Sequence, residues 1–478
     1  DFQAGKENDL PILQPVDLNG RFTAEFKGYE GMWVKDADKK IMEALKKAGR
    51  LWKVQMYGHD YPFCWRCDTP LLYYAKDAWF LKTTAIKDII IKNNNNINWH
   101  PPFMGSGRFG DFLENMIDWA LSRERYWGTP LNIWVCQKCG QKVSIGSRRE
   151  LVDLARDPEL AKKVEFHKPY IDKVVLMCLR CGGDMHRVPE VIDCWFDSGA
   201  MHTAQWHYPF ENRDVFFTEK YPADFICEGQ DQTRGWFYSL LVLSSLVYRS
   251  PCFLNVLGTG LGLDKNGVKM SKSLKNMIDP WELIRLFGAD VVRWYYAWNT
   301  APWNSMILSI DLFRETLNKF MGTLRNTVSF FVIYANIAGY DPRKVDKNSV
   351  KYRLIDRWIL SKINRLARDV TRLMDNFDSF HAARDIDAFV DDLSNWYIRS
   401  TRQRFWEFEM TESKVAAFET LYEVLVTLSK ILAPFIPFWA EETYLSLVKS
   451  VYPDAKESVH LCDFPQPAEN MIDDVIED

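Results

Sequence analysis

The sequence lacks several features that would place it in other classes of protein. It contains no apolar run of 18 or more residues, so no transmembrane span is predicted. Its net charge of −4 excludes a global basic field, and any nucleic-acid contact must come from local patches. Ten cysteines among 478 residues are too few for a disulfide scaffold. The sequence shows no initiator Met, signal peptide, transit pattern or internal repeat.

What is present predicts two kinds of architecture. Apolar residues make up 47% of the chain, enough to bury several cores in roughly three domains. Strands at 225–227 and 253–257 around a helix at 235–248 predict a parallel α/β sheet. From about Leu308 to Leu447 the pattern is helical and predicts a bundle of four or five helices. Further predictions are helices at 36–49 and 110–124, strands at 51–56 and 71–74, an exposed polar turn at 93–96, and a frayed acidic terminus at 451–478.

A lysine-rich loop follows the second of these strands. After glycines at 258, 260 and 262 comes Lys269-Met-Ser-Lys272-Ser273. Two ammonium groups three residues apart on a loop can close over a polyphosphate and offset the charge that develops when a phosphoanhydride breaks. Taken alone, the cluster fits a solvated basic turn better.

Two cysteine knuckles give the most specific metal signal. Cys136-Gln-Lys-Cys139-Gly and Cys178-Leu-Arg-Cys181-Gly supply four thiolates, the number that a closed tetrahedral zinc site takes. Four thiolates leave no open position, so the predicted zinc is structural. The alternative is four reduced thiols without a metal.

A third pair, Cys64 and Cys67, has the same spacing but no following glycine. Two thiolates do not close a tetrahedral site. The pair is either half of a metal site completed from outside this chain or a plain pair of cysteines.

Three further stretches gather polar and aromatic residues. Glu228-Gly229-Gln-Asp231-Gln232 follows a strand and opens a helix, the place where open α/β sheets bind ligands; the alternative is a helix cap. Residues 191–199, which include Trp195, fit either a ligand pocket or a buried strand and turn. Residues 118–128 place arginines beside aromatics and fit either phosphate binding or a salt-bridged helix end.

In the helical part, Arg399, Arg402 and Arg404 alternate with aromatic residues. Aromatic faces stack on unpaired bases and arginines hold phosphates, so this stretch is a candidate RNA contact. The alternative is an ordinary helix whose aromatics pack into the core.

Together these motifs resemble the class I aminoacyl-tRNA synthetases. Residues 269–273 match the second signature of that class at all five positions, and residues 118–128, 195–199 and 228–237 resemble the isoleucyl-tRNA synthetases, in the form that carries cysteine knuckles. The valyl relative is the alternative specificity. The resemblance implies the second half of a Rossmann-like α/β fold with a parallel sheet and a zinc-knuckle insertion, followed by an all-α helical bundle.

The resemblance also implies partners and residue roles. The family activates isoleucine with ATP and Mg²⁺ and transfers it to tRNA(Ile) in the cytoplasm, with no membrane. Glu228, Gly229, Asp231 and Gln232 would bind the isoleucyl-adenylate, and Trp195 and Trp236 would wall the amino-acid pocket. Lys272 would contact ATP and Lys269 would support the loop as the second catalytic lysine. Arg399, Arg402 and Arg404 would bind tRNA, and Cys136, Cys139, Cys178 and Cys181 would hold structural Zn²⁺.

Several departures from the family pattern limit these expectations. None of the eight histidines lies in the first signature, His-x-Gly-His. Lys275 stands where many relatives have glycine, and Thr259-Gly260 is also less usual. Asp1 resembles the end of an editing-pocket motif and would anchor the amine of a misactivated amino acid.

The expected organisation is that of a partial synthetase, lacking the first half of the nucleotide-binding fold and therefore inactive alone. The alternatives are a zinc-stabilised tRNA-binding module without catalysis and a zinc protein with neither activity. The expected segments are the end of the editing insertion (1–58), the return into the catalytic domain (59–132), the zinc-knuckle insertion (133–190), the second Rossmann half (191–260), the lysine loop and stem-contact region (261–310), the anticodon-binding bundle (311–450) and a tail (451–478).

Overall fold

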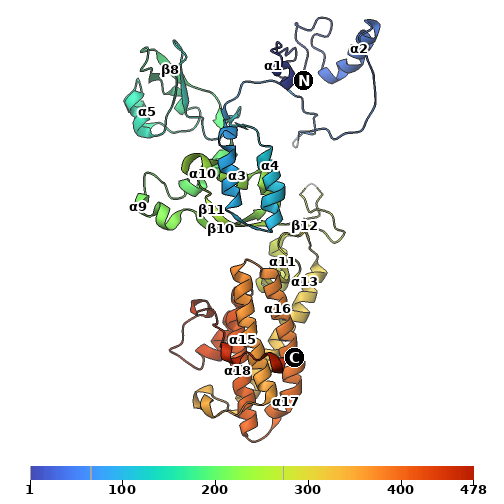
Figure 1. Cartoon of the computed structure of the whole chain (residues 1–478), viewed down its shortest axis with the longest axis vertical. Coiled ribbons are helices and arrows are strands. Elements are labelled where there is room, and N and C mark those ends of the chain that lie inside the picture. Colours follow the sequence, from blue (N-terminus) through green and yellow to red (C-terminus); the bar gives the residue numbers. More distant parts are fainter. Residues whose placement is uncertain (1, 65–66, 273, 478) are drawn as a thin grey trace. The chain divides into compact units, whose positions relative to one another are not determined.

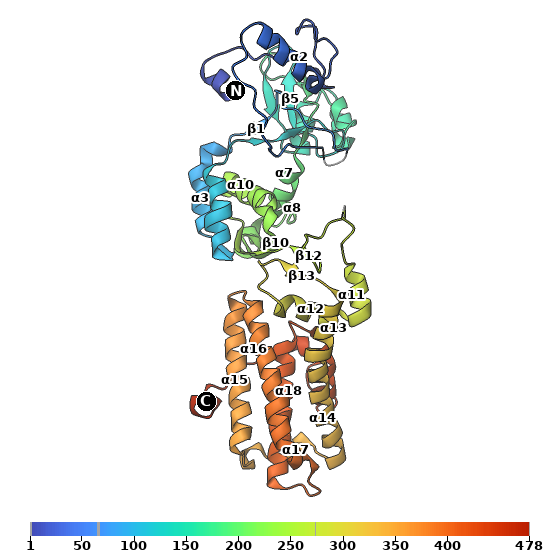
Figure 2. The same ribbon diagram turned by 90° about the vertical axis from the view of Figure 1, so that its right-hand side faces the viewer.

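The computed structural model describes residues 2–64, 67–272 and 274–477. The chain divides into two compact units: Asp1–Phe80 with Ala120–Arg123, and Leu81–Trp119 with Glu124–Asp478. Figure 1 and Figure 2 show the course of the chain in two views. Among the residues described, no helix has both the length and the apolar character needed to cross a bilayer.

The described part of the first unit contains two helices, α1 (Phe2–Glu7) and α2 (Val34–Lys47), the two-residue strand β4 (Ser122–Arg123) and mostly irregular chain. The helix predicted at 36–49 is confirmed. The strands predicted at 51–56 and 71–74 are wrong, because neither segment is assigned to a strand. Trp52 is 97% exposed and Tyr73 is 99% exposed, so these apolar side chains have no core to pack against.

The second unit begins with a parallel sheet. β10 (Ala223–Gly229) and β11 (Phe253–Thr259) pair in parallel, as predicted, and α10 (Trp236–Tyr248) connects them. A third parallel strand, β2 (Asn98–His100), lies beside β11 and was not predicted. Glu228 aligns with Gly258 and Gly229 with Thr259, so the two strands end together.

Helix α10 packs against α3 (Lys87–Asn95), which precedes β2, and Tyr238 of α10 meets Phe112 of α4 (Gly110–Glu114) edge to face. The π-helical turn Met104–Phe109 leads into α4 and packs on it. The helix predicted at 110–124 therefore ends at Glu114. The polar turn predicted at 93–96 is confirmed only at Asn96, because α3 continues to Asn95 and both Asn93 and Asn94 are buried. Asn93 Nδ2 donates to Ser245 Oγ at 2.8 Å, and Asn94 Oδ1 accepts from Trp99 Nε1 at 2.9 Å.

The cysteine knuckles lie on a separate antiparallel sheet. Its order is β6 (Lys142–Ser144), β5 (Ile133–Cys136), β8 (Asp184–Arg187) and β7 (Leu176–Met177). Two helices, α5 (Arg148–Leu154) and α6 (Pro158–Lys163), pack on its small apolar core.

A helical segment then leads into the bundle. α11 (Pro280–Phe287), α12 (Ala289–Trp298) and α13 (Ile310–Thr316) surround the short parallel pair β12 (Gly262–Leu263) and β13 (Met306–Ile307). Asp290 fastens α12 to the bundle by accepting the backbone N–H of Trp439 at 2.7 Å. Arg293 Nε donates to the carbonyl of Phe435 at 3.0 Å.

The predicted helical bundle is confirmed, but its described residues form six helices where four or five were predicted. Its helices are α14 (Gly322–Ala338), α15 (Leu354–Asp375), α16 (Ser379–Asp391), α17 (Arg399–Trp406), α18 (Glu412–Leu432) and α19 (Pro437–Tyr444), with π-helical segments at Leu317–Met321, Asp392–Ile398 and Leu445–Lys449. Their shared core includes Leu324, Ile363 and Leu425.

The terminus predicted to be frayed is folded against α15. Glu477, in α20 (Asp474–Glu477), accepts a hydrogen bond from Arg365 Nε at 2.7 Å, and Asn364 Oδ1 accepts the N–H of Ala468 at 2.8 Å. An acidic side chain that suggested disorder thus pairs with an arginine of the bundle.

The remaining strands and helices are short. They are β1 (Phe80–Leu81), β3 (Trp119–Ala120), β4 (Ser122–Arg123), β9 (Val191–Ile192), α7 (Cys194–Gly199), α8 (Met201–Ala204), α9 (Arg213–Val215) and several short 3₁₀ and π turns.

Candidate functional site

The polar cluster at Glu228 lies where the sequence placed it, at the carboxyl end of β10. The chain leaves the strand at Gly229, makes one tight turn over Gln230–Arg234 and enters α10. Glu228 and Asp231 are exposed. Gln232 Oε1 accepts the backbone N–H of Trp236 at 2.9 Å, so part of the cluster does cap the helix, and the cap is Gln232 rather than a carboxylate.

Gly235 lets the two tryptophans of the predicted pocket meet at this turn. A Cβ atom at Gly235 would lie 2.6 Å from Gln232 Oε1 and 3.1 Å from Cη2 of Trp195. Trp236 Nε1 donates to the carbonyl of Ser198, at the end of α7, at 3.0 Å. Trp195 keeps 40% of its surface exposed beside Gly235. The two rings therefore border an open site next to Glu228 instead of filling the core.

Helix α7 is held against α10 by a glycine contact. A Cβ at Gly199 would lie 2.8 Å from the backbone of Ser239, so only glycine permits this approach. Asp193 caps α7 by accepting the N–H of Trp195 at 3.1 Å. Residues 191–199 thus form a two-residue strand followed by a helix, and the buried strand-and-turn alternative holds only for Val191 and Ile192.

Residues 118–128 are not a helix end. Asp118 accepts the N–H and the hydroxyl of Thr84 at 3.0 and 2.7 Å, and these hydrogen bonds, the hydroxyl's first, lower the pKa of its carboxyl group. Arg123 donates to the carbonyls of Ala120 and Ser122. Arg125 is exposed, so of the two arginines its guanidinium is the better placed for a phosphate.

The lysine loop follows β12 (Gly262–Leu263), which the chain reaches two residues after the end of β11. Asp264 Oδ1 accepts the N–H groups of Asn266 and Val268 at 2.9 and 3.0 Å, which closes a tight turn. Lys269 and Lys272 are exposed and have no ion pair among the described residues. Ser273 lies outside the described residues. Because β10 and β11 end together, the Glu228 cluster and the segment that leads through β12 to the lysine loop leave the sheet from neighbouring strand ends.

Asn276 fastens this loop, and sequence reasoning gave it no role. Its Oδ1 accepts the N–H of Ser271 at 2.9 Å, and its Nδ2 donates to Asp264 Oδ2 at 3.0 Å and to the carbonyl of Lys269 at 3.3 Å. The side-chain bond from Asn276 is the main cause of the lowered pKa of Asp264. One amide side chain therefore joins both ends of the segment that carries the lysines.

We expect Asn276→Ala to loosen the loop without unfolding the protein. Three hydrogen bonds at a part-exposed site are lost, each worth about 1 kcal/mol. Hydrogen–deuterium exchange at residues 264–272 should accelerate, whereas exchange in β10 and α10 should not change. Asn266→Ala is the matched control because only its backbone is seen to bond. Equal exchange in the two variants would contradict the fastening role.

The two departures from the family pattern have a backbone explanation. Lys275 has φ +53°, in the left-handed region in which glycine is favoured. The loop therefore keeps this backbone conformation with a lysine in place of glycine, at the cost of some backbone strain. Gly260 is required, because a Cβ there would lie 2.1 Å from the carbonyl oxygen of Asn304.

His202 lies in α8, which packs against α10; it is buried, and its Nε2 has no hydrogen-bond partner within the part of the chain that the structure describes. Burial lowers its pKa, and the hydrogen bond between Nδ1 and the carbonyl of Gly199 offsets this only in part. Below pH 6.5, the ordinary pKa of histidine, the unfolded chain therefore binds a proton at His202 more readily than the folded protein does. We expect stability to be kept above pH 6.5 and lost as the pH falls below it.

Urea unfolding at pH 7.5 and 5.5 measures this loss, and His202→Phe should reduce the difference between the two pH values. The variant comparison isolates His202 from part-buried carboxyl groups such as that of Glu423, whose pKa is raised by burial and whose effect on the pH dependence of stability has the opposite sign. A pH dependence that His202→Phe leaves intact would show that other groups cause it.

The four knuckle cysteines come together as predicted. Their sulfur atoms all lie within 4.8 Å of one another, with Cys136 to Cys181 at 3.5 Å and Cys139 to Cys178 at 3.7 Å. A tetrahedral zinc with Zn–S bonds of about 2.3 Å places sulfurs about 3.8 Å apart, so this donor set fits the metal. Gly140 and Gly182, one after each knuckle, have φ +70° and +68°, the turn for which glycine was expected. The N–H of Cys139 is the largest of the causes that lower the pKa of Cys136, to about 6.

The third cysteine pair is not part of such a cluster. Among the described residues, the only group of cysteine, histidine or carboxylate side chains with metal-binding geometry is the knuckle set. The Cys67 sulfur lies 3.1 Å from Thr69 Oγ1, and that hydrogen bond lowers the pKa of Cys67. Cys64 and Cys67 stay a candidate half-site. Asp1, the candidate editing residue, lies outside the described residues.

The three arginines of the helical part separate into two groups. Arg399 and Arg402 are exposed, with Trp396 59% and Trp406 51% exposed on the same stretch. Arg404 is buried, and both its Nη atoms bond the carboxylate of Asp356, at 2.7 and 2.8 Å. The assignment of Arg404 to RNA is therefore wrong, because its guanidinium is consumed inside the bundle. The core alternative holds for Tyr397 and Phe405 but not for the two tryptophans.

The structure thus combines a parallel α/β sheet that has polar turns at its strand ends with a helical bundle that follows it in the sequence. The family model for tRNA synthetases class I (I, L, M and V) matches residues 18–309, and that for the anticodon-binding domain of tRNA ligase matches residues 356–478. The chain belongs to the class I tRNA synthetases.

Curated relatives and solved structures agree with this. The chain is 48% identical over its full length to isoleucine–tRNA ligases of Clostridium acetobutylicum and Dehalococcoides mccartyi, of which it covers 46% and 47%. It thus spans about half the length of these relatives. The methionyl-tRNA synthetase of Mycobacterium tuberculosis with methionyl-adenylate shares the fold, with a TM-score of 0.58 at 16% identity over 85% of this chain and 72% of that one. A LeuRS–tRNA–LeuAMS complex from Agrobacterium radiobacter K84 gives 0.55 at 20% identity over 75% and 44%.

Proposed function

We propose that this chain is the part of an isoleucine-specific tRNA ligase that holds the adenylate and the tRNA. The observation that carries the proposal is the shared end of β10 and β11, from which the Glu228 cluster and the segment leading through β12 to the lysine loop both emerge. Identity of 48% with isoleucine–tRNA ligases supports isoleucine as the amino acid. The proposal includes the seven segments predicted from the sequence, from the end of the editing insertion (1–58) to the tail (451–478).

The residues act by positioning and by charge. Glu228 and Asp231, both exposed acceptors, bind the ammonium group and ribose hydroxyls of isoleucyl-adenylate, and Gly229 lets the ligand approach the backbone. Gln232 orients the turn through its bond to Trp236. Trp195 and Trp236 contact the aliphatic side chain.

Lys272 and Lys269 act on the phosphates. Both ammonium groups are exposed on a loop whose ends Asn276 joins, so they can move toward ATP while the loop keeps its shape. Their charge stabilises the departing pyrophosphate, and Mg²⁺ would accompany the ATP.

The helical bundle binds tRNA. Arg399 and Arg402 contact phosphates, and Trp396 and Trp406 offer faces for unpaired bases. Zn²⁺ held by Cys136, Cys139, Cys178 and Cys181 stabilises the insertion and takes no part in the reaction.

Two measurements test the proposal. The His-x-Gly-His signature is absent from the sequence, so the chain alone should give no isoleucine-dependent ATP–pyrophosphate exchange. It should bind tRNA with an affinity that falls steeply as salt rises. If the chain alone catalyses isoleucine-dependent ATP–pyrophosphate exchange, the proposal that activity requires the first signature is overturned. Failure to bind tRNA at low salt would overturn the RNA-binding role and favour a zinc protein with neither activity.

Salt-sensitive binding without exchange agrees with both the partial ligase and the non-catalytic module. Supplying a chain segment that contains the signature then distinguishes them, because only the ligase gains exchange.

A further inference from the structure

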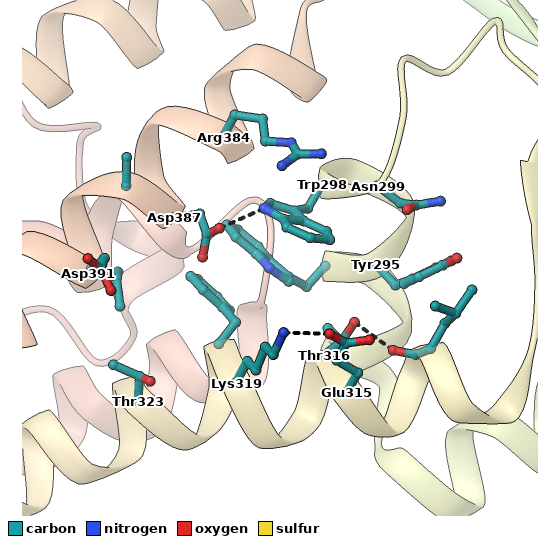
Figure 3. Close-up of a pocket in the computed structure, with 15 residues that line it drawn as sticks. Tyr295, Trp298, Asn299, Glu315, Thr316, Lys319, Thr323, Arg384, Asp387 and Asp391 are labelled. Carbon is teal, nitrogen blue, oxygen red and sulfur yellow. Dashed lines mark hydrogen bonds and ion pairs between the residues drawn. The ribbon is translucent and has the colours of Figure 1, made fainter.

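A pocket that the function above does not use lies between α12, α13 and α16. Its volume is about 790 Å³, within the range of small-molecule sites. Figure 3 shows its walls: aromatic side chains on α12, and on the facing helices a set of charged side chains. The π-helical segment Leu317–Met321, which supplies Lys319 and Phe320, forms one wall. Such segments inside helices occur often at functional sites.

The apolar part of the pocket is flat and rigid. Trp294 and Phe320 stack at 3.7 Å with an interplanar angle of 4° and are both buried. The Arg384 guanidinium lies 4.2 Å from the ring centroid of Trp298. Trp298 is itself fixed, because its Nε1 donates to Asp387 Oδ2 at 2.8 Å. Aromatic rings and a stacked guanidinium are the surfaces on which nucleic-acid bases lie.

The polar part favours one kind of ligand. The carboxylates of Glu315, Asp387 and Asp391 line the pocket, against the cations of Lys319 and Arg384. Lys319 is engaged by Glu315 at 2.5 Å. The excess of carboxylates repels phosphate, so a phosphate group would stay outside. The carboxylates accept hydrogen bonds, so they favour a planar ligand that offers N–H donors.

Asp387 is the side chain that sets this preference. It is part-buried, and burial raises its pKa, while the bond from Trp298 opposes that rise. Among the described residues, only its Oδ2 takes part in a hydrogen bond, which leaves Oδ1 for a ligand. A part-buried carboxylate with spare acceptor capacity, next to stacked rings, suits an exocyclic amino group on a flat ring.

We propose that this pocket takes a single unstacked nucleobase carrying an exocyclic amino group, that is guanine, adenine or cytosine, and discriminates against uracil. The base comes either from a bound RNA or from a free nucleoside. The RNA source rests on the proposed tRNA binding, whereas the base site itself does not.

Ligand-observed NMR titration of the chain with guanosine, adenosine, cytidine and uridine tests the site. The amino-bearing nucleosides should bind about tenfold more tightly than uridine, the difference expected for a hydrogen bond to a carboxylate. Asp387→Asn keeps the shape and an acceptor for Trp298 and should remove most of that difference. Asp385→Asn removes the same charge from the same helix outside the pocket and should change nothing. Equal binding of all four nucleosides, no binding, or insensitivity to Asp387→Asn would overturn the proposal.

Titration of tRNA into the same variants distinguishes the sources of the base. Weaker tRNA binding by Asp387→Asn than by Asp385→Asn assigns the site to a base of the RNA. Unchanged tRNA binding with selective nucleoside binding assigns it to a free nucleoside. If no variant binds tRNA but amino-bearing nucleosides still bind selectively, the proposed tRNA role fails and the base site stands.

Discussion

Replacing Cys178 by serine is expected to unfold the insertion over residues 133–190 and to abolish zinc binding. The apolar core of this segment is small, and two of the four sulfur ligands, Cys136 and Cys178, are themselves members of it. Binding of structural zinc contributes on the order of 10 kcal/mol to small domains of this type, more than such a core supplies. The metal is therefore expected to decide whether the four-stranded sheet forms.

Elemental analysis and hydrogen–deuterium exchange measure the two effects together. The unmodified chain should contain one zinc ion per molecule, and Cys178→Ser should contain almost none and lose protection in β5 and β8. Cys194→Ser is the matched control, since Cys194 is exposed and outside the cluster. A chain purified without zinc that still protects β5 and β8 would show that the cysteines are reduced thiols and that the core suffices.

The motifs were predictable because each depends on local chemistry. A Cys-x-x-Cys-Gly knuckle needs a glycine in a left-handed conformation directly after it, and Gly140 and Gly182 provide it. The pattern from 223 to 259 alternates one apolar strand, one apolar helix and one apolar strand, which leaves few folds other than a parallel sheet.

The wrong predictions all depended on partners distant in the sequence. The segments 51–56 and 71–74 have strand-like composition, but the described residues provide no strand that pairs with either of them. Asn93 and Asn94 resemble a loop tip until Ser245 and Trp99 satisfy their amides in the core. The tail after 451 looks disordered by composition, and Arg365 of α15 holds it in place.

The site was predictable in its residue types and not in its supports. Lys269 and Lys272 are recognisable in sequence, whereas Asn276 bonds across the loop to a residue twelve positions away and carries no motif of its own. In the same way, the spacing of Arg399, Arg402 and Arg404 could not show which of them turns inward. That depends on Asp356, which is 48 residues from Arg404.

Arg404→Ala is expected to destabilise the bundle by about 3–5 kcal/mol, because it leaves the Asp356 carboxylate buried without its counter-charge. Arg404 also donates to the carbonyl and hydroxyl of Ser413, at 3.1 and 3.0 Å from Nε, so the substitution leaves those acceptors unpaired as well. The hydroxyl of Tyr397, bonded to Asp356 Oδ1 at 2.9 Å, can compensate only a small part. Urea unfolding followed by far-UV circular dichroism measures the loss.

The control for this prediction also separates structure from RNA binding. Arg399→Ala removes an exposed guanidinium five residues earlier and should change the free energy of unfolding by no more than about 0.5 kcal/mol, while weakening tRNA binding. Arg404→Lys restores the charge but not the paired hydrogen bonds, so its stability should lie between those of Arg404→Ala and the unmodified chain. If Arg404→Ala unfolds at the same urea concentration as the unmodified chain, the buried pair contributes nothing, and Arg404 returns to the candidates for tRNA contact.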